Sequence, residues 1–344
     1  MLIWCAMKKT AIHSMLLIAI ITFAPICAFS QKQTDANSDK PLKLGIDLVV
    51  LDAYVLNKRT GRAVGSLNRD DFTIYENGVR QQITHFSQDV LPLSVIILID
   101  TSSSVWSFIS QIREGAFQAL EHLKPDDEIA LMATAGHTEL VQDFTRNKRL
   151  VAERIKNLDE KALGDDGILL HEAVYQAAAH FRKASNPDGR RAIIAITDDM
   201  STQRLASQGH SEKEAFDELY ESGITVCGLL VGYHHLFKAK WYDPFGAVVN
   251  RSYRRKYFGP GSIRKYAEDT GGVVLVVEKG DISAKLAEII IQLRRRYSFG
   301  YVSSNTRLDG KFRKINMAVS DKIKRREGGI AVLTRKGYYP RAGK

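Results

Sequence analysis

Oxygen-bearing side chains follow two apolar runs of the sequence. The run LSVIILID (93–100) ends in an aspartate, and two serines follow it at alternate positions. The run RRAIIAITDD (190–199) ends in two aspartates. Carboxylate and hydroxyl oxygens are the ligands that a hard divalent cation prefers. If both runs are parallel strands that end at one edge of a sheet, they predict a site for Mg²⁺ or another divalent cation. The predicted ligands are Asp100, Ser102, Ser104 and Asp198.

Buried strands alternate with helices between residues 91 and 296. Further apolar runs typical of buried strands are DEIALMATAG (127–136), ITVCGLLVG (224–232) and VVLVVE (273–278). Segments with apolar residues at helical spacing separate these runs. Continuous apolar strands separated by helices are typical of a mostly parallel sheet that is covered on both faces. We therefore predict a Rossmann-like α/β domain over residues 91–296.

Strand patterns without helices flank this domain on both sides. Residues 44–90 alternate in strand fashion and contain Asn77-Gly78, the strongest short signal for a hairpin. Short strand-like runs also fill residues 297–344. The simplest arrangement packs both flanks into one small β domain, with the α/β domain inserted between them. Two separate β appendages are the alternative.

These segments together resemble a known family. Residues 93–293, with D-x-S-x-S after a buried strand and the second aspartate in order, resemble a von Willebrand factor type A domain with a metal-ion-dependent adhesion site. The flanking segments RDDFTIYENGVRQQITHFSQD, YSFGYVSSN, DGKFRKI and RKGYY are similar to those of bacterial secreted VWFA-related proteins. The resemblance implies a binding module that mediates protein–protein interaction or adhesion, not an enzyme.

The resemblance also implies roles for the site residues. In that family the serines bind the metal directly, and the aspartates act through water molecules. The family uses a further threonine from a loop before the central helix, but here Ile168 follows the matching Gly167. Because isoleucine has no ligating atom, Asp165 or Asp166 from the same loop is the candidate substitute. Asp199 replaces a glycine that is common after the second aspartate, and it adds negative charge near the site.

A metal-free interpretation stays open beside this one. The serines after residue 101 are also good caps for the helix that follows. The long segment 234–261 is rich in aromatic and basic side chains, a composition typical of interface hot spots. The protein would then be a structural scaffold that binds its partner through this segment, unless the segment packs on its own domain. The candidate contact residues are Trp241, Tyr242, Tyr253, Arg254, Arg255 and Tyr257.

Several functional classes lack their motifs in this sequence. No G-x-S-x-G elbow supports Ser102 as a nucleophile, and nothing in the sequence places His171 beside it. His171-Glu172 also lacks the second histidine of a zinc-protease motif. Neither a Walker loop nor a dinucleotide-binding glycine pattern is present. We therefore expect a partner that is a protein or a polysaccharide, with no nucleic acid bound and no catalysis.

The first 30 residues have the features of a secretory signal peptide. Lys8 and Lys9 precede the apolar segment Met15–Ile26, which is too short to cross a bilayer as a helix. Cleavage after Ser30 would leave a polar leader, residues 31–43, and no transmembrane segment; an uncleaved anchor is the alternative. We therefore expect a secreted or periplasmic protein.

Composition agrees with a folded, exported protein. The 344 residues are 44% hydrophobic and 26% charged, which excludes a disordered chain and a multi-pass membrane protein. The formal net charge of +10 fits attraction to anionic surfaces but does not by itself indicate nucleic acid. Cys5 and Cys27 would leave with the signal peptide. Cys227 is then the single remaining thiol, so the core and not a disulfide must hold the fold.

Overall fold

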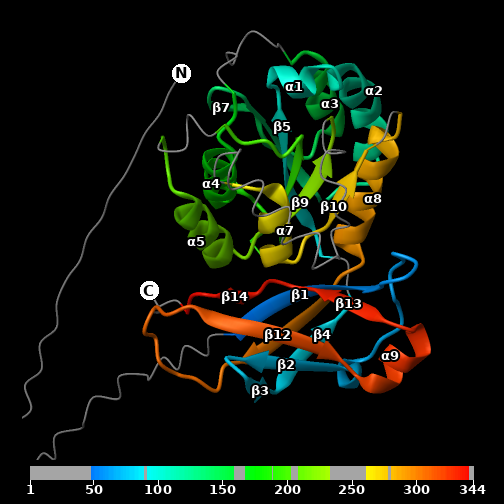
Figure 1. The fold of residues 1–344 in the computed structure, drawn as a ribbon, viewed down its shortest axis with the longest axis vertical. Helices are drawn as coiled ribbons and strands as arrows, with labels where there is room; N and C mark the ends of the chain where they lie inside the picture. Colours follow the sequence, from blue (N-terminus) through cyan, green and yellow to red (C-terminus); the bar gives the residue numbers. More distant parts are fainter. Residues whose placement is uncertain are drawn as a thin grey trace, which may run out of the picture. The chain divides into compact units, whose positions relative to one another are not determined.

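The computed structural model describes residues 48–88, 91–158, 167–187, 189–202, 208–232, 261–277 and 280–340. These residues belong to one compact unit, Gly45–Lys344, which contains an α/β domain and a β domain (Figure 1). The predicted signal peptide (1–30) and leader (31–43) lie outside the described residues. Within the described part of the chain, no helix is long and apolar enough to cross a membrane.

A six-stranded sheet forms the centre of the α/β domain, in the order β10-β9-β8-β5-β6-β7. All neighbouring strands are parallel except β6 and β7. The predicted mostly parallel sheet is therefore confirmed, whereas the antiparallel edge strand β7 was not predicted. The strands are β5 (Leu93–Asp100), β6 (Glu128–Thr134), β7 (Thr138–Thr145), β8 (Arg190–Thr197), β9 (Thr225–Leu230) and β10 (Val274–Val276).

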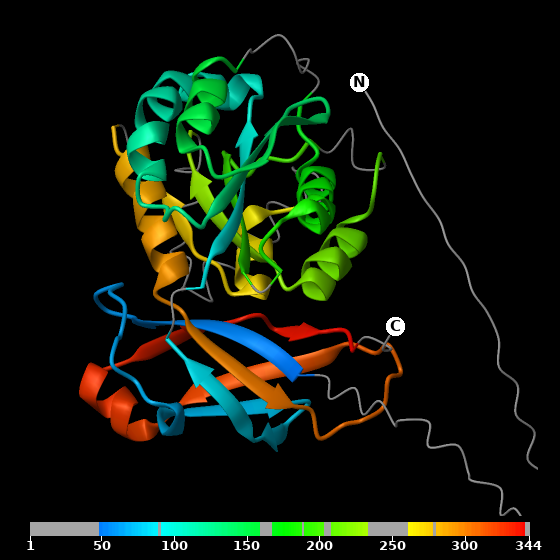
Figure 2. The same cartoon turned by 180° about the vertical axis from the view of Figure 1, so that it is seen from behind.

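Helices cover both faces of this sheet, as Figures 1 and 2 show from opposite sides. Alternate strand residues point to opposite faces, so Ile97 and Ile99 of β5 join an apolar cluster with α2, α3 and α8. Ile96 and Leu98 join a second cluster with α4, α5 and α7. The helices are α1 (Ser103–Trp106), α2 (Ile109–Leu120), α3 (Lys148–Lys156), α4 (Leu170–His180), α5 (Glu212–Ser222), α7 (Ile263–Thr270) and α8 (Ile282–Arg294).

Strands from both sides of the α/β domain form the β domain. β1 pairs with β11 and β13, and β2 pairs with β12, so the prediction of one small β domain is confirmed and that of two separate appendages is wrong. The strands build two sheets, β13-β1-β11-β4 and β14-β12-β2-β3. The elements are β1 (Leu48–Asn57), β2 (Phe72–Glu76), β3 (Val79–Gln81), β4 (Ile83–Ser87), β11 (Tyr297–Val302), β12 (Arg313–Val319), α9 (Asp321–Glu327), β13 (Ile330–Leu333) and β14 (Gly337–Tyr338).

Aromatic side chains fill the space between the two sheets of the β domain. The ring centroid of Phe72 in β2 lies 4.8 Å from that of Phe299 and 5.2 Å from that of Tyr297 in β11. The hairpin from β2 to β3 turns at Asn77 and Gly78, with φ angles of 48° and 85°. Positive φ at both positions is what a tight type I′ turn requires, so the predicted hairpin is confirmed.

Arg190, at the start of β8, ties the β domain to the α/β domain. Its Nε donates to Asp52 Oδ1 of β1 at 3.1 Å, and its Nη2 donates to Ser298 Oγ of β11 at 2.9 Å. The guanidinium also donates to the backbone carbonyls of Arg294 and Arg296, around the end of α8. One buried side chain thereby joins three elements of the two domains, at the opposite end of β8 from Asp198.

Candidate functional site

The carboxyl ends of β5 and β8 meet at one edge of the sheet. The two strands are parallel neighbours, with Ile99 opposite Ile196. Asp100 therefore ends β5 beside Thr197, whose hydroxyl donates to Asp100 Oδ2 at 2.6 Å. Asp198 follows directly in the chain. Strand register alone thus brings the two predicted aspartates to the same edge.

The two predicted serines lie at the start of α1, next to Asp100. Ser102 Oγ is 3.2 Å from Ser104 Oγ, and the backbone N–H of Ser102 donates to Asp100 Oδ1 at 2.9 Å. Ser102 occupies the N-cap position of α1, but its side chain makes no capping hydrogen bond. The Ser102 hydroxyl therefore does not cap α1, and it lies within hydrogen-bond distance of the Ser104 hydroxyl instead.

Asp198 has a carboxylate oxygen without a donor. The residue is 3% exposed, and its Oδ1 accepts a hydrogen bond from the backbone N–H of Met200 at 3.0 Å. Its Oδ2 is buried and accepts no hydrogen bond from any residue that the structure describes. A buried, ionised oxygen without a partner is costly, and a bound cation would relieve that cost.

Burial and mutual repulsion both disfavour the charged forms of these aspartates. Burial raises the pKa of Asp100, although hydrogen bonds from Ser102 and Thr197 oppose the shift. Burial, and then the charge of Asp100, raise the pKa of Asp198 to about 7, although the Ser104 hydroxyl and the backbone N–H of Met200 oppose the shift. A proton or a positive ion bound between these two carboxylates would reduce their repulsion, so the site favours such binding.

The donor set fits a hard divalent cation. Within the described ranges, no group of three or more His, Cys, Asp or Glu side chains is placed to hold a metal ion. The candidate site instead combines two carboxylates with two hydroxyls, all of them oxygen donors. The residues that would hold the ion are Asp100, Ser102, Ser104 and Asp198.

Asp199 points its carboxylate at a helix and not at the predicted ligands. It accepts hydrogen bonds from the backbone N–H of Ile263 at 2.7 Å and from Ser262 Oγ at 3.1 Å, at the start of α7. Its φ angle is +63°, a left-handed conformation that glycine adopts most easily. Its charge still adds to the forces that raise the pKa of Asp198. Asp199 therefore supplies negative charge near the site while it anchors α7.

Ile168, at the position of the family's threonine, is part of the core. It is 2% exposed and belongs to the apolar cluster beneath α4. Its backbone N–H donates to Thr202 Oγ1 at 3.0 Å, and its carbonyl accepts from the N–H of Thr202 at 2.8 Å. These contacts fix Gly167 and Ile168 beside the chain that follows Asp198. The proposed substitute ligands, Asp165 and Asp166, lie outside the described residues.

Ile168→Thr is expected to destabilise the protein by about 1–2 kcal/mol, because it places a hydroxyl in an apolar cluster. We expect no gain in Mg²⁺ affinity, since the side chain belongs to the core and not to the edge of the sheet. Chemical denaturation and metal titration check the two parts. Ile168→Val is the control and should cost less. A markedly tighter Mg²⁺ affinity in Ile168→Thr would show that this position still reaches the cation.

Gly232 and Gly261 are the described residues at the two ends of the aromatic and basic segment. A Cβ added at Gly232 would lie 3.6 Å from Asp198 Cβ and from the carbonyl oxygen of Ser104. A Cβ added at Gly261 would lie 2.8 Å from the backbone nitrogen of His171. The candidate partner-binding residues of this segment lie outside the described residues: Trp241, Tyr242, Tyr253, Arg254, Arg255 and Tyr257.

Sequence reasoning missed two polar residues that shape the site. Thr197 orients Asp100, and Ser262 holds Asp199. Thr197 could have been found, because it is the last residue of a buried strand and immediately precedes Asp198. Ser262 could not, since 63 residues separate it from Asp199. Cys227 is buried in β9, and burial raises the pKa of its thiol, as expected for a structural cysteine.

Comparison with known proteins identifies the α/β domain. Residues 95–201 match the family model described as von Willebrand factor type A domain. The chain contains a von Willebrand factor type A (VWA) domain. The matched residues run from β5 to the loop after β8, so the VWA match includes both strand ends of the candidate site. The β domain lies outside the matched range.

Solved structures with similarity to the chain include three from bacteria. An aerotolerance-related membrane protein from Bacteroides fragilis is 16% identical, with 58% of this chain and 98% of that chain covered and a TM-score of 0.41. A von Willebrand factor type A structure from Catenulispora acidiphila is 11% identical, with coverages of 77% and 73% and a TM-score of 0.44. The vWF domain of the type V pili tip protein Mfa5 from Porphyromonas gingivalis is 18% identical, with coverages of 33% and 40% and a TM-score of 0.29. No curated protein matches the sequence.

Proposed function

We propose that the VWA domain binds a protein partner through a divalent cation, such as Mg²⁺, at the carboxyl edge of its sheet. Asp100, Ser102, Ser104 and Asp198 would hold the cation, and an acidic side chain of the partner would complete its coordination. The observation that carries the proposal is the buried Asp198 Oδ2, which has no hydrogen-bond donor in the described part of the chain and lies near a second carboxylate.

Each residue has a distinct task in this proposal. A bound cation supplies positive charge and an open position for an oxygen ligand. Thr197 and the backbone of Ser102 fix the Asp100 carboxylate, so the site needs little reorganisation to receive the ion. The hydroxyls of Ser102 and Ser104 donate oxygen ligands without adding negative charge. A partner carboxylate is therefore repelled less than it would be by a site built from carboxylates alone.

We further propose that the protein acts outside the cytoplasm, secreted or in the periplasm, as an interaction or adhesion module without catalysis. The support is the signal-like N-terminal sequence, with Lys8 and Lys9 before Met15–Ile26, and the lack of a recognisable nucleophile and base motif. A VWA domain is itself a module suited to protein interaction. The alternative is a polysaccharide partner, and binding assays with proteins and with polysaccharides would distinguish the two.

Saturating Mg²⁺ is expected to raise the melting temperature above that in EDTA, because a ligand that binds only the folded state stabilises it. At a concentration 100 times the Kd, the gain is about 2.7 kcal/mol. Ser102→Ala should lose most of this shift. Ser103→Ala is the matched control, because Ser103 is exposed and lies between the two predicted ligands.

Two results would count against the proposal. Wild-type protein could show no stabilisation by Mg²⁺ or Mn²⁺, or Ser102→Ala could keep the full shift. Either result would favour the metal-free scaffold, in which the segment 234–261 contacts the partner.

A further inference from the structure

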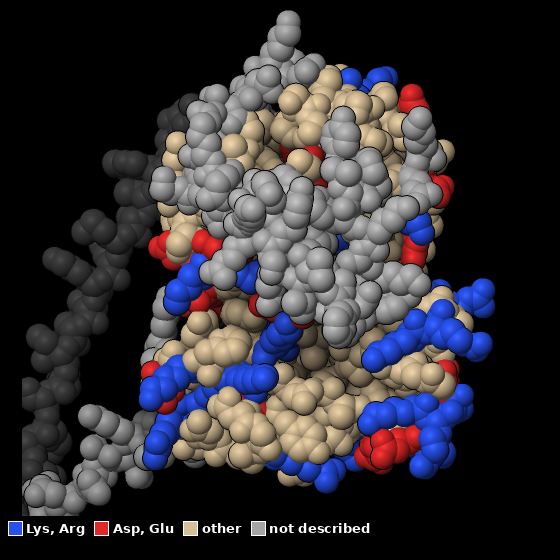
Figure 3. Space-filling model, viewed as in Figure 1, with Lys and Arg blue, Asp and Glu red and all other residues tan. Residues whose placement is uncertain are grey.

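The positive charge of the protein is concentrated in its β domain. Residues 48–88 and 297–340 contain 15 Lys and Arg but 7 Asp and Glu, whereas residues 91–296 contain 27 and 28. The side of the β domain seen in Figure 3 accordingly shows many Lys and Arg side chains among uncharged ones, and few acidic ones. Such a field attracts an anionic partner, and it does so away from the acidic edge of the VWA sheet.

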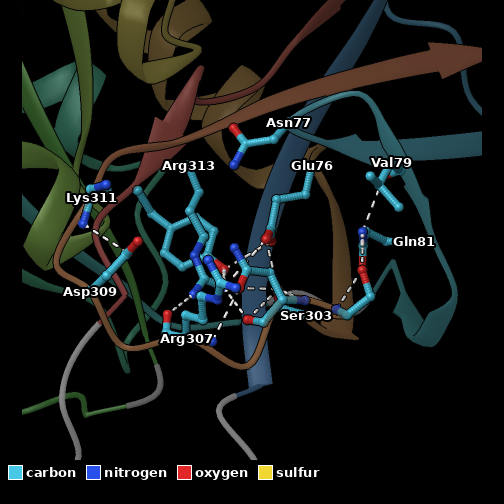
Figure 4. A network of polar contacts seen from close by, with 12 residues as sticks. Glu76, Asn77, Val79, Gln81, Ser303, Arg307, Asp309, Lys311 and Arg313 are labelled. Atoms are coloured by element: carbon cyan, nitrogen blue, oxygen red, sulfur yellow. Dashed lines mark hydrogen bonds and ion pairs between the residues drawn. The ribbon is translucent and has the colours of Figure 1, made fainter.

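A buried ion pair fixes an exposed loop of this domain (Figure 4). Glu76 and Arg313 are 2% and 3% exposed, and Arg313 Nη1 lies 3.3 Å from Glu76 Oε1. The same Nη1 donates to the carbonyl of Asn305 at 2.7 Å, and Nη2 donates to the carbonyl of Arg307. The hydroxyls of Tyr301, Ser303 and Tyr338 also donate to Glu76. The connection between β11 and β12, residues 303–312, is therefore held in one conformation.

Local hydrogen bonds stiffen this connection further. The side chain of Asn305 accepts from the N–H of Arg307 at 3.1 Å, and that of Asp309 accepts from the N–H of Lys311 at 3.2 Å. The loop thereby presents Leu308, 50% exposed, between two exposed cations, Arg307 and Lys311. An ordered loop with this pattern loses little conformational entropy when it binds.

Further apolar side chains are exposed on β11, which leads into this loop, and on its neighbour β1. Val302 ends β11 and pairs with Leu48, the first residue of β1; they are 44% and 50% exposed. Val50, on the same face of β1, is 53% exposed. Apolar side chains set among cations suit the boundary between lipid headgroups and acyl chains, because the cations contact the anionic headgroups and the apolar side chains contact the acyl chains.

We propose that this end of the β domain, formed by loop 303–312 with Leu48, Val50 and Val302, binds a lipid surface that carries anionic headgroups. The exposed apolar side chains favour a lipid surface over other anionic partners. A nucleic acid or an acidic protein surface would pair with the cations, but it would offer no apolar layer for Leu308 and its neighbours.

Vesicle co-flotation tests the proposal with residues 31–344, since removal of the predicted signal peptide prevents its apolar segment from binding lipid. The wild-type chain is expected to bind phosphatidylglycerol-containing vesicles at low salt, to release them at high salt, and to bind pure phosphatidylcholine weakly. Arg307→Glu with Lys311→Glu should weaken binding by at least about 25-fold, because the loss of each cation alone costs about fivefold and each added carboxylate is repelled by the anionic headgroups. Leu308→Ser should weaken it about fivefold.

The matched control reverses two exposed cations of α9, Lys322→Glu with Arg325→Glu. α9 lies at the other end of the β domain, as both views show (Figures 1 and 2). We expect this control to weaken binding much less than the loop variant. If the loop variant and the α9 variant lost vesicle binding equally, the effect would come from net charge alone, and the assignment of binding to the loop would be overturned. Absence of vesicle binding by the wild type would also overturn it. Vesicle binding should persist in EDTA and in Asp198→Asn. The vesicle test therefore stays informative even if the proposed cation site does not bind metal.

Discussion

Replacement of Arg190 by methionine is expected to lower the free energy of unfolding by about 3–5 kcal/mol. The side chain is 4% exposed and makes four hydrogen bonds, to Asp52, to Ser298 and to two backbone carbonyls. Methionine has a similar length, so the variant removes the charge and the donors while most of the volume stays filled. The two carbonyls would then lose this donor at the junction of the two domains, and Asp52 would keep its hydrogen bond from Ser298 Oγ but lose its cation.

Chemical denaturation measures this loss, and Arg69→Met is its control. Arg69 also forms an ion pair, 3.4 Å from Asp70, but the two side chains are 57% and 90% exposed. An exposed pair contributes at most about 1 kcal/mol. Similar losses in the two variants would mean that Arg190 does not hold the domains together.

Asp198→Asn is expected to act in opposite directions on stability and on metal binding. At pH 8 without metal, it should stabilise the protein by about 2 kcal/mol, because it removes a buried charge that the neighbouring Asp100 repels. The same change should weaken Mg²⁺ binding severely, since a neutral amide oxygen is a poorer ligand than a carboxylate. A residue that costs stability in the absence of its ligand is typical of a functional site.

The pH dependence of the metal-free protein follows from the same carboxylate. The pKa of Asp198 is about 7 in the folded protein, against 3.8 for an ordinary aspartate, so between these values the folded state holds a proton that the unfolded state has lost. The free energy of unfolding should therefore fall as pH rises from about 4 to about 7, and this contribution should be lost above that range. Denaturation in EDTA at pH 5 and pH 8 measures the fall. In Asp198→Asn the free energy of unfolding should fall less between these two pH values. An equal fall in the variant and the wild type would contradict the assignment of this pH dependence to Asp198.

The strands that carry the site could be predicted from sequence because buried strands consist almost entirely of apolar residues. Every residue of β5 is buried, and an unbroken apolar run is what such a strand requires. The Asn77-Gly78 hairpin was equally predictable, since few dipeptides tolerate two positive φ angles. Asp100 and Asp198 then follow from the rule that parallel strands end at the same edge.

The rest depends on contacts between distant residues. β7 escaped prediction because its residues are half-exposed and its pairing with β6 is irregular. Arg190 looked like the start of a strand, and its partner Asp52 lies 138 residues away. The missing donor at Asp198 Oδ2 likewise has no signature in the sequence, because it depends on what surrounds that atom after folding.

Isothermal titration of the chain with Mg²⁺ and Mn²⁺ at pH 8 measures whether the ends of β5 and β8 hold a cation. At this pH most Asp198 side chains are ionised and can accept the cation. We expect saturable binding by the wild type and an affinity about 100-fold weaker in Asp100→Ala, whose side chain orients the site. Wild-type protein that binds neither metal, or Asp100→Ala that binds as tightly as the wild type, would contradict a cation site at the ends of β5 and β8.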